Sequence, residues 1–133
     1  MQKKNLVLLN QIHSNKLFII KKVPLNKPKG DGAITNKQKI ALGILTADCA
    51  PILIFDSIRK IIAVAHAGWK GAYNKVVIKI IKKLIKLGSK KENIFAAIGP
   101  CISQQNYEVQ QDFRKKFLKQ AKKNKKYFKI VRK

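Results

Sequence analysis

The side chains with the most reactive chemistry in this sequence are two histidines and two cysteines, His13, His66, Cys49 and Cys101. Three of them stand where an apolar run meets small or turn-forming residues. His13 follows a short apolar run, Cys49 closes a Thr-Ala-Asp-Cys stretch, and His66 directly precedes Ala-Gly-Trp-Lys-Gly. Thiolate and imidazole are ligands that zinc prefers in proteins. If the fold gathers these three side chains, they leave the fourth position of a tetrahedral zinc ion open, as catalytic zinc sites do.

A predicted β-hairpin gives a geometric reason to expect Cys49 close to His66. Residues 51–55 and 61–65 form short, continuous apolar runs, which are typical of buried strands. A two-residue turn at Ser57-Ile58 would place Cys49 directly opposite His66. Residues opposite each other in an antiparallel pair have Cβ atoms about 4.5–5.5 Å apart, which is close enough to share a zinc ion.

The residues beside these ligands indicate what the site could do. Zinc lowers the pKa of bound water to about 7 and polarises a substrate atom as a Lewis acid. Asp48 could orient a ligand or act as a general base. Gly68 would let a substrate approach the backbone closely, and Lys70 precedes an expected helix, whose N-terminus favours anions. These features predict a site that also binds phosphate.

The same residues allow other interpretations. Cys49 and His66 could instead form the nucleophile and base of a thiol hydrolase, with no metal and no role for His13. Cys101 is interpreted as a packed side chain, with a fourth metal contact or a redox-sensitive thiol as alternatives. Trp69 is interpreted as a packing or lid aromatic on which a purine could stack.

The hydrophobic pattern predicts strands and helices mixed along the chain. Strands are expected at residues 6–12, 17–22, 40–45, 51–55, 61–65 and 94–98, and helices at residues 73–87 and 109–122. Gly88 stands where a helix C-cap is expected, residues 22–32 are expected to form a loop, and residues 127–131 a strand or a frayed tail. The expected fold class is α+β, a mixed sheet with flanking helices.

Length and composition indicate one domain, residues 1–133, with a Lys-rich C-terminal segment from about residue 111. The formal net charge is +24, and the 30 basic residues include only three arginines. Because nucleic-acid binders more often mix arginine and aromatics into a basic surface, we attribute the charge to a compositional bias, as in AT-rich genomes. The alternative is a non-enzymatic basic remnant that binds nucleic acid or anionic surfaces.

The sequence also predicts a cytoplasmic protein with no membrane span. Its apolar runs are too short to cross a bilayer, and the four apolar residues 6–9 are too few for the core of a signal peptide. Two cysteines do not make a disulfide framework, which favours a reducing compartment.

Six blocks of the sequence, taken in order, resemble the YfiH/laccase-domain family of purine nucleoside phosphorylases, formerly described as multicopper polyphenol oxidases. The blocks are Gln11-Ile12-His13-Ser14, Gly30-Asp31-Gly32-Ala33-Ile34-Thr35, Thr46-Ala47-Asp48-Cys49-Ala50-Pro51-Ile52, His66-Ala67-Gly68-Trp69-Lys70-Gly71, Ile98-Gly99-Pro100-Cys101-Ile102 and Tyr107-Glu108-Val109. The Thr-Ala-Asp-Cys and His-Ala-Gly-Trp blocks are the specific ones. The resemblance runs from about residue 11 to residue 109 and implies the family's mixed α/β sandwich fold.

The resemblance implies zinc, with copper as the alternative metal, held by His13, Cys49 and His66. It implies phosphorolysis of purine nucleosides such as adenosine and inosine, with adenosine deamination and cleavage of methylthioadenosine as associated activities. We assign Asp48, Cys49 and His66 to catalysis. We assign Lys70, Gly68 and Asp31 to binding of substrate or phosphate. The expected partners are purine nucleosides and phosphate, with nucleic acid bound only non-specifically and an oligomer possible.

Two departures from the family pattern affect these expectations. Lys70 stands where the family usually has arginine, so the charge is kept but the planar, bidentate grip on phosphate is lost. Family members are also longer at both ends, so the domain is expected to be incomplete and its activity impaired.

Overall fold

The structure of the protein is a computed structural model, which describes residues 5–130. The chain forms two compact units, residues 1–101 and residues 102–133. Each unit is described by itself below. The expected Lys-rich segment, from about residue 111, lies within the second unit.

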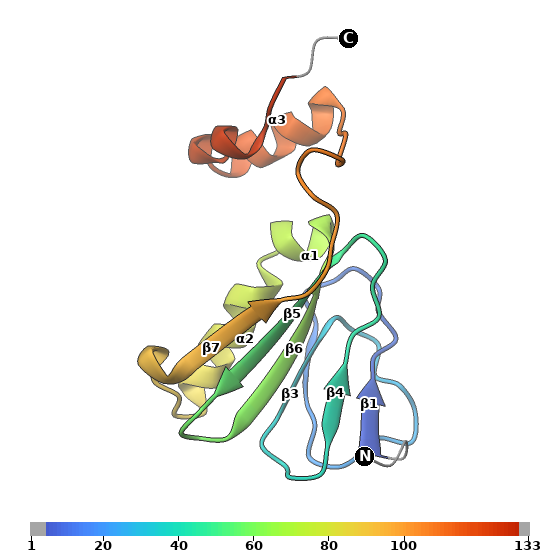
Figure 1. Cartoon of the computed structure of the whole chain (residues 1–133), viewed down its shortest axis with the longest axis vertical. Helices are drawn as coiled ribbons and strands as arrows, with labels where there is room; N and C mark the ends of the chain where they lie inside the picture. Colours follow the sequence, from blue (N-terminus) through green and yellow to red (C-terminus); the bar gives the residue numbers. More distant parts are fainter. Residues whose placement is uncertain (1–4, 131–133) are drawn as a thin grey trace. The chain divides into compact units, whose positions relative to one another are not determined.

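The first unit is built on a mixed sheet, as predicted, and this sheet has five strands (Figure 1). Its strands, in spatial order, are β2 (Leu17–Ile19), β3 (Gly32–Thr35), β6 (Ile61–Ala67), β5 (Ala50–Asp56) and β7 (Ile94–Ile98). β2 and β3 run parallel, whereas the β3–β6, β6–β5 and β5–β7 pairs are antiparallel. The hairpin of β5 and β6 therefore forms the middle of the sheet, and β7 lies at one edge.

Several predicted boundaries are wrong because pairing, and not local sequence, fixes the strands. The pattern does not predict β3, since its four residues begin with glycine, yet all four are buried between β2 and β6. The strand expected at residues 6–12 is only β1 (Leu6–Leu8), and the one expected at residues 40–45 is only β4 (Ala41–Gly43). Each of these short strands is followed by a loop: the loop after β1 carries His13, and the loop after β4 leads to Cys49.

Two helices follow β6 where one was predicted. The first is α1 (Trp69–Tyr73) and the second is α2 (Val76–Lys86). Lys75 separates them, because its φ of 61° lies in the left-handed region that an α-helix cannot contain. Gly88, with a φ of 92°, follows α2 in the left-handed conformation expected near a helix C-terminus.

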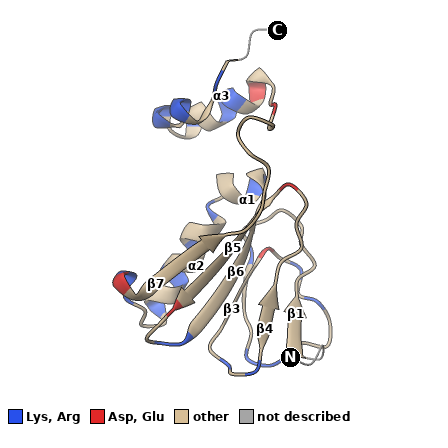
Figure 2. Ribbon diagram, in the orientation of Figure 1, with Lys and Arg blue, Asp and Glu red and all other residues tan. Residues whose placement is uncertain are grey.

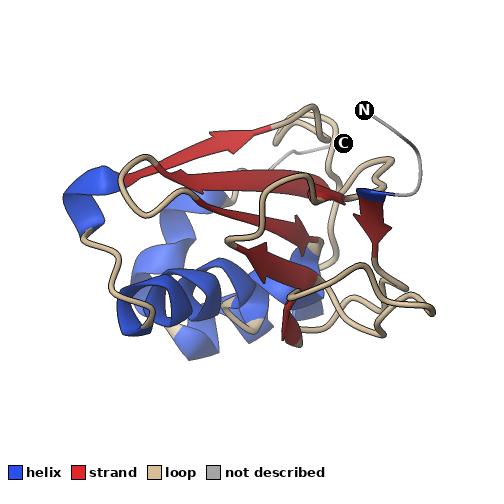
Figure 3. Ribbon diagram, turned by 90° about the horizontal axis from the view of Figure 1, so that it is seen from below, coloured by secondary structure: helices blue, strands red, loops and turns tan. Residues whose placement is uncertain are grey.

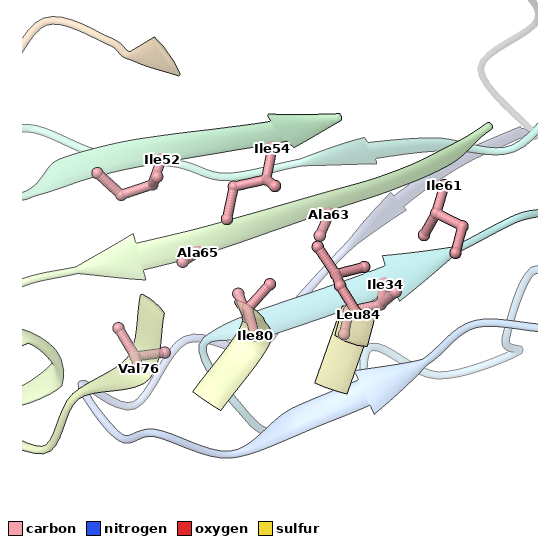
Figure 4. Packing of buried hydrophobic residues seen from close by; sticks show 9 residues of the cluster. All are labelled: Ile34, Ile52, Ile54, Ile61, Ala63, Ala65, Val76, Ile80 and Leu84. Atoms are coloured by element: carbon pink, nitrogen blue, oxygen red, sulfur yellow. The ribbon is translucent and has the colours of Figure 1, made fainter. Parts of the chain in front are cut away.

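The main hydrophobic core lies between α2 and one face of the sheet (Figure 4). The apolar side chains at every fourth position of α2 point at the strands because a helix repeats every 3.6 residues. The buried members of this core are Ile34, Ile52, Ile54, Ile61, Ala63, Ala65, Val76, Ile80 and Leu84.

We expect Ile80→Ala to be among the more destabilising single changes, because the Ile80 side chain is fully buried in this core. Truncating a buried isoleucine to alanine costs about 2–5 kcal/mol of unfolding free energy. The matched control is Ile78→Ala on the exposed side of the same helix, where the expected change is within about 0.5 kcal/mol. Urea unfolding followed by circular dichroism measures both, and equal losses would contradict this placement of α2.

The opposite face of the sheet is only partly covered. β1 and β4 form a small parallel sheet beside the larger one (Figure 3). Side chains of this layer, Val7 and Leu9 among them, pack with Ile20, Ala33 and Val64 in a second core. The half of that face on β5 and β7 has no such cover among the described residues of the first unit.

The prediction that residues 94–98 form a buried strand is therefore half right. β7 has the predicted bounds, but its last four residues are exposed. Its run of apolar residues is typical of a strand covered on both faces, whereas β7 is an edge strand in this structure.

The predicted two-residue hairpin turn is wrong. The pairing of Asp56 with Ile61 leaves four residues, 57–60, in the turn. One carboxylate oxygen of Asp56, Oδ1, accepts hydrogen bonds from the backbone N–H groups of Ile58 and Arg59, both at 2.9 Å. Lys60 completes the turn with a left-handed φ of 52°. The Asp side chain thus stabilises a longer turn, which shifts the strand register by two residues.

The second unit contains α3 (Gln111–Gln120), shorter than the predicted 109–122, and a 3₁₀ segment at Lys122–Tyr127. The rings of Phe113, Phe117 and Phe128 pack together, with centroids 4.9–6.4 Å apart. Of the two alternatives predicted for residues 127–131, a strand or a frayed tail, the strand is wrong for residues 127–130, while residue 131 lies outside the described residues.

Lysine and arginine residues are spread over both units (Figure 2). No helix within residues 5–130 combines the length and the apolar character that crossing a membrane requires.

Candidate metal centre

The structure brings His13, Cys49 and His66 together at one end of the five-stranded sheet. Each comes from a different segment: the loop after β1, the residue before β5, and the C-terminal part of β6. Their ligand atoms all lie within 4.8 Å of one another. The Sγ atom of Cys49 lies 3.9 Å from Nε2 of His13, and the two imidazole centroids are 4.7 Å apart. We call these three residues the His–Cys–His cluster.

The predicted proximity is confirmed, although the predicted register is wrong. His66 pairs with Pro51, and the ladder ends at the pair of Ala50 and Ala67. Continuing this register places Cys49 opposite Gly68, two residues beyond His66. The thiol still reaches the imidazoles because Gly68 has no side chain in the space between them. A Cβ on Gly68 would lie only 2.8 Å from Sγ of Cys49 and 3.0 Å from Cδ2 of His13.

Asp31, directly before β3, connects the segments that carry both histidines. Its Oδ1 atom lies 2.8 Å from Nδ1 of His66 and accepts the backbone N–H of His13 at 2.9 Å. Its Oδ2 atom accepts the backbone N–H and the hydroxyl of Ser14, at 2.6 and 2.7 Å, and the N–H of Ile12 also points at this carboxylate. One fully buried side chain therefore fixes the loop of His13 and the ring of His66.

These contacts also set the protonation of the pair. Burial raises the pKa of the Asp31 carboxyl, but the hydrogen bonds from His66, Ser14 and Ile12 outweigh it, and the net shift of the pKa is downward. An ionised Asp31 can only accept, so Nδ1 of His66 donates the proton. In the neutral ring, Nε2 of His66 then carries the lone pair that a metal ion binds.

From the sequence alone, Asp31 is assigned to binding of substrate or phosphate. In the structure both of its oxygens accept hydrogen bonds from the protein, and the side chain is fully buried. A carboxylate between a histidine and the protein interior is a common outer-shell partner of metal sites. We therefore propose that Asp31 positions the ligands and does not contact substrate.

The backbone of His13 is held in an uncommon conformation. Its φ of 57° lies in the left-handed region, which costs a residue other than glycine on the order of 1–3 kcal/mol. The hydrogen bonds from this loop to Asp31 offset that cost. Strain of this kind collects at functional sites, where the surrounding structure holds a side chain in a required direction.

Gln11 is a positioning residue whose role the sequence did not reveal. Its side-chain amide donates to the carbonyl of Leu45 at 2.8 Å, and its side-chain carbonyl accepts the N–H of the same residue at 2.9 Å. These two bonds join the loop that carries His13 to the loop that leads to Cys49. The sequence feature that could have pointed to this role is the position of Gln11, two residues before His13 in the first of the blocks that resemble the family.

The environment of Cys49 does not favour a nucleophilic thiol. Burial, together with the negative charges of Asp48 and Asp31, raises the pKa of this half-buried side chain. Thiol nucleophiles instead need a lowered pKa. Metal binding overcomes the shift because the ion stabilises the thiolate directly, so the geometry favours a metal ligand over a thiol hydrolase.

The other predicted site residues lie around the cluster or apart from it. Asp48 is exposed on the loop before Cys49, and Lys70 is exposed on α1, with its Nζ atom 5.6 Å from the ring centroid of Trp69. The helix expected to attract anions is only the five-residue α1, so it contributes little macrodipole. Cys101 is exposed, so its interpretation as a packed side chain is wrong, and it lies outside the cluster.

Gly68→Ala is expected to weaken metal binding without disturbing the backbone. The φ and ψ of Gly68, −66° and 170°, suit any residue, but the new methyl group would overlap Sγ of Cys49. Gly43→Ala is the matched control, since its Cβ would meet Leu8 at a similar 2.7 Å, away from the cluster. Competition with a chromophoric zinc chelator measures both variants. Equal zinc affinity for Gly68→Ala and the native chain would contradict this geometry.

The residues present fit a metal ion. One thiolate and two imidazoles form a donor set that zinc binds, with about 2.3 Å to sulfur and 2.0–2.1 Å to nitrogen. Tetrahedral geometry with these bond lengths separates sulfur from nitrogen by about 3.6 Å, close to the 3.9 Å between Cys49 and His13. Three protein ligands leave one coordination position for a reactant.

A mixed sheet with flanking helices and a His–Cys–His cluster at its end define an α/β protein with a candidate metal centre. The family model described as multi-copper polyphenol oxidoreductase laccase matches residues 1–133. The chain belongs to this family, as the sequence blocks predicted.

Curated relatives of this chain are named purine nucleoside phosphorylases. One from Rickettsia prowazekii is 40% identical over 124 residues, which are 93% of this chain and 51% of the relative. One from Corynebacterium glutamicum is 40% identical over 106 residues, which are 77% of this chain and 43% of the relative. The chain thus spans about half the length of the curated relatives it matches.

Solved structures share the fold. The Neisseria meningitidis protein NMB0706, of family DUF152, superposes with a TM-score of 0.83 and 28% identity over 96% of this chain and 51% of that chain. The hypothetical protein YfiH of Bacillus licheniformis superposes with a TM-score of 0.78 and 26% identity over 85% of this chain and 46% of that chain. These matches confirm the predicted fold class.

Proposed function

We propose that this chain carries the metal centre of a zinc-dependent purine nucleoside phosphorylase, which converts adenosine or inosine and phosphate into the free base and ribose 1-phosphate. The observation that carries the proposal is the His–Cys–His cluster, whose ligand atoms lie within 4.8 Å of one another. The names of the relatives supply the reaction class.

The reaction needs groups that bind the phosphate anion, bind the nucleoside and transfer one proton to the leaving base. A phosphate oxygen forms a bond to C1′ of the ribose while the bond from C1′ to the purine nitrogen breaks. The base leaves with the bonding electrons and gains a proton. A zinc ion held by His13, Cys49 and His66 would supply Lewis-acid polarisation of a bound reactant.

The remaining residues have roles that follow from their positions. Asp31 holds the His66 ring and the His13 loop in place. Asp48, exposed beside Cys49, is proposed as the acid or base that moves the proton. Lys70, exposed on α1, is proposed to attract phosphate, and Gly68 leaves the space over the thiol free.

The metal is proposed to be zinc. The whole sequence has two histidines and two cysteines, which suffice for one site of this kind and not for several copper ions with imidazole ligands. Copper is the second choice, because a His₂Cys set also binds copper in some proteins. The proposal places the protein in the cytoplasm, where Cys49 stays reduced.

The direct test is to purify the full chain, measure bound zinc by mass spectrometry, and follow base release from adenosine and inosine with phosphate present or absent. We expect about one zinc per chain and phosphate-dependent base release. Liquid chromatography of the same reaction mixtures separates base from nucleoside. It therefore also reports release of adenine from methylthioadenosine and conversion of adenosine to inosine, the two further activities we propose. A folded chain that binds no zinc would overturn the proposal.

A further inference from the structure

The short helix α1 begins at the His–Cys–His cluster. Gly68 is its N-cap residue, and a Cβ there would lie 2.8 Å from Sγ of Cys49 and 3.0 Å from Cδ2 of His13. Trp69 and Lys70 are the first two residues of α1, and Nζ of Lys70 lies 5.6 Å from the centroid of the Trp69 ring. The position of α1 therefore decides where this cation and this ring stand beside the metal ligands.

α1 has little in its own sequence to hold it in place. It has only five residues, and isolated helices shorter than about 12–15 residues are marginal in water. Its N-cap residue is a glycine, which has no side chain to cap the first turn. Of its five residues, all of which the structure describes, Gly71 alone is buried. Contacts with other segments must therefore fix the position of α1.

One such contact is the close approach of Gly71 to both segments that carry the histidine ligands. A Cβ at Gly71 would lie 3.0 Å from the carbonyl oxygen of His66 and 3.4 Å from the carbonyl oxygen of Ser14, the residue after His13. Both oxygens belong to the backbone, so a side chain at this position would push α1 away from them. Glycine therefore lets α1 lie directly against these two segments.

The second contact is made by Asn15, two residues after His13. Its side-chain amide donates a hydrogen bond from Nδ2 to the carbonyl oxygen of Asn74 at 2.8 Å. Asn74 is the C-cap residue of α1, and the last carbonyl groups of a helix have no partner within it. Asn15 thus ties the C-terminal end of α1 to the loop that supplies His13.

We infer that Asn15 is a positioning residue that holds α1, and with it Trp69 and Lys70, beside the metal centre. Its hydrogen bond joins segments that are 59 residues apart in the sequence. The part of this inference that concerns phosphate rests on the proposed function, in which Lys70 attracts that anion. The anchoring of α1 itself does not depend on the reaction.

The role of Asn15 differs from those of Asp31 and Gln11, which fix the segments of the metal ligands. Removing the Asn15 amide leaves in place the hydrogen bonds that His13 and Ser14 donate to Asp31. We therefore expect the zinc affinity to stay within about twofold of the native value, as for independent sites. In contrast, α1 should become more mobile, and phosphate should bind more weakly.

The single tryptophan of the chain, Trp69, makes tryptophan fluorescence a probe of α1. The test compares the zinc-loaded full chain with Asn15→Ala and with Asn15→Asp, which keeps the shape of the side chain but cannot donate when ionised. We expect a larger acrylamide quenching constant and a lower anisotropy of Trp69 in both variants. Asn10→Ala, at an exposed asparagine earlier in the chain, is the matched control and should give native values.

Titration of the same proteins with inorganic phosphate, followed by the fluorescence of Trp69, measures the consequence for anion binding. We expect Asn15→Ala to raise the phosphate dissociation constant about fivefold, which is the effect of losing one ordinary hydrogen bond. Competition with a chromophoric zinc chelator measures the zinc affinity. If the native chain shows no response to phosphate, the proposed role of Lys70 fails, while the quenching of Trp69 still decides whether Asn15 anchors α1.

Two results would overturn the inference. Native values of quenching and anisotropy in both Asn15 variants would show that α1 is held without this amide. A loss of zinc affinity as large as the loss of phosphate affinity would show that Asn15 acts through His13 and not through α1. Circular dichroism spectra that match the native chain ensure that neither result comes from misfolding.

Discussion

Replacing Cys49 with serine is expected to reduce zinc affinity by more than about 100-fold. Losing a residue that only supports a ligand already lowers metal affinity by up to about 100-fold, and Cys49 is proposed to bind the ion directly. The cluster has only one sulfur ligand, and a serine hydroxyl stays protonated at neutral pH and binds zinc poorly. Inductively coupled plasma mass spectrometry after equilibration in a zinc buffer measures the bound metal. Cobalt substitution gives a second readout, because thiolate-to-cobalt absorption should disappear in the variant.

The sequence offers a matched control for this experiment. Cys101 is the only other cysteine, it is exposed, and it lies outside the cluster. Cys101→Ser should keep the zinc affinity and the cobalt absorption of the native chain. If both variants kept zinc equally well, the cluster would not be the metal site, and the proposed phosphorolysis would lose its structural support.

Replacing Asp31 with asparagine is expected to lower zinc affinity by about 10–100-fold, as loss of an outer-shell carboxylate does. Both oxygens of Asp31 accept hydrogen bonds, so an amide NH₂ in either place would face N–H or O–H donors of Ser14 and His13, or Nδ1 of His66. The ring of His66 would lose its fixed tautomer, and the loop of His13 would lose the bonds that hold its left-handed φ.

Nitrogen NMR of the imidazoles tests this role apart from catalysis. In the native chain the Nδ1 of His66 should carry the proton, and in Asp31→Asn the two tautomers should mix. Asp112→Asn, at an exposed acid on α3, is the control and should change neither the tautomer nor the zinc affinity. Ser14→Ala removes one donor only and should give a smaller loss of affinity. Unchanged tautomer and affinity in Asp31→Asn would show that this carboxylate does not position the ligands.

The candidate ligands could be selected from the sequence because chemistry restricted the choice. The chain has only four histidine and cysteine residues, and three of them stand where an apolar run meets small or turn-forming residues. The ligand set that the family resemblance implies then singled out Cys49 and not Cys101. The sequence could not show that the thiol reaches the imidazoles from opposite Gly68 and not from opposite His66, because a turn capped by Asp56 changed the register.

The supporting residues were hidden for a similar reason. Asp31 lies in a loop-like, glycine-flanked stretch, and its importance comes from bonds to Ser14 and His66, which are 17 and 35 residues away. Gln11 clamps a loop 34 residues away. Hydrogen bonds over such separations have no local pattern, so only the folded chain reveals them.

The sequence by itself determined the fold class, the apolar runs of β5, β6 and β7, and the three residue types able to hold a metal, because these depend on local periodicity and on side-chain chemistry. The tertiary structure alone decided the internal strand β3, the break between α1 and α2, the hydrogen bonds of Asp31 to the segments of both histidines and the place of β7 at the edge of the sheet. Each of these depends on which distant segment lies next to a residue, and that is settled by burial and strand pairing over the whole first unit.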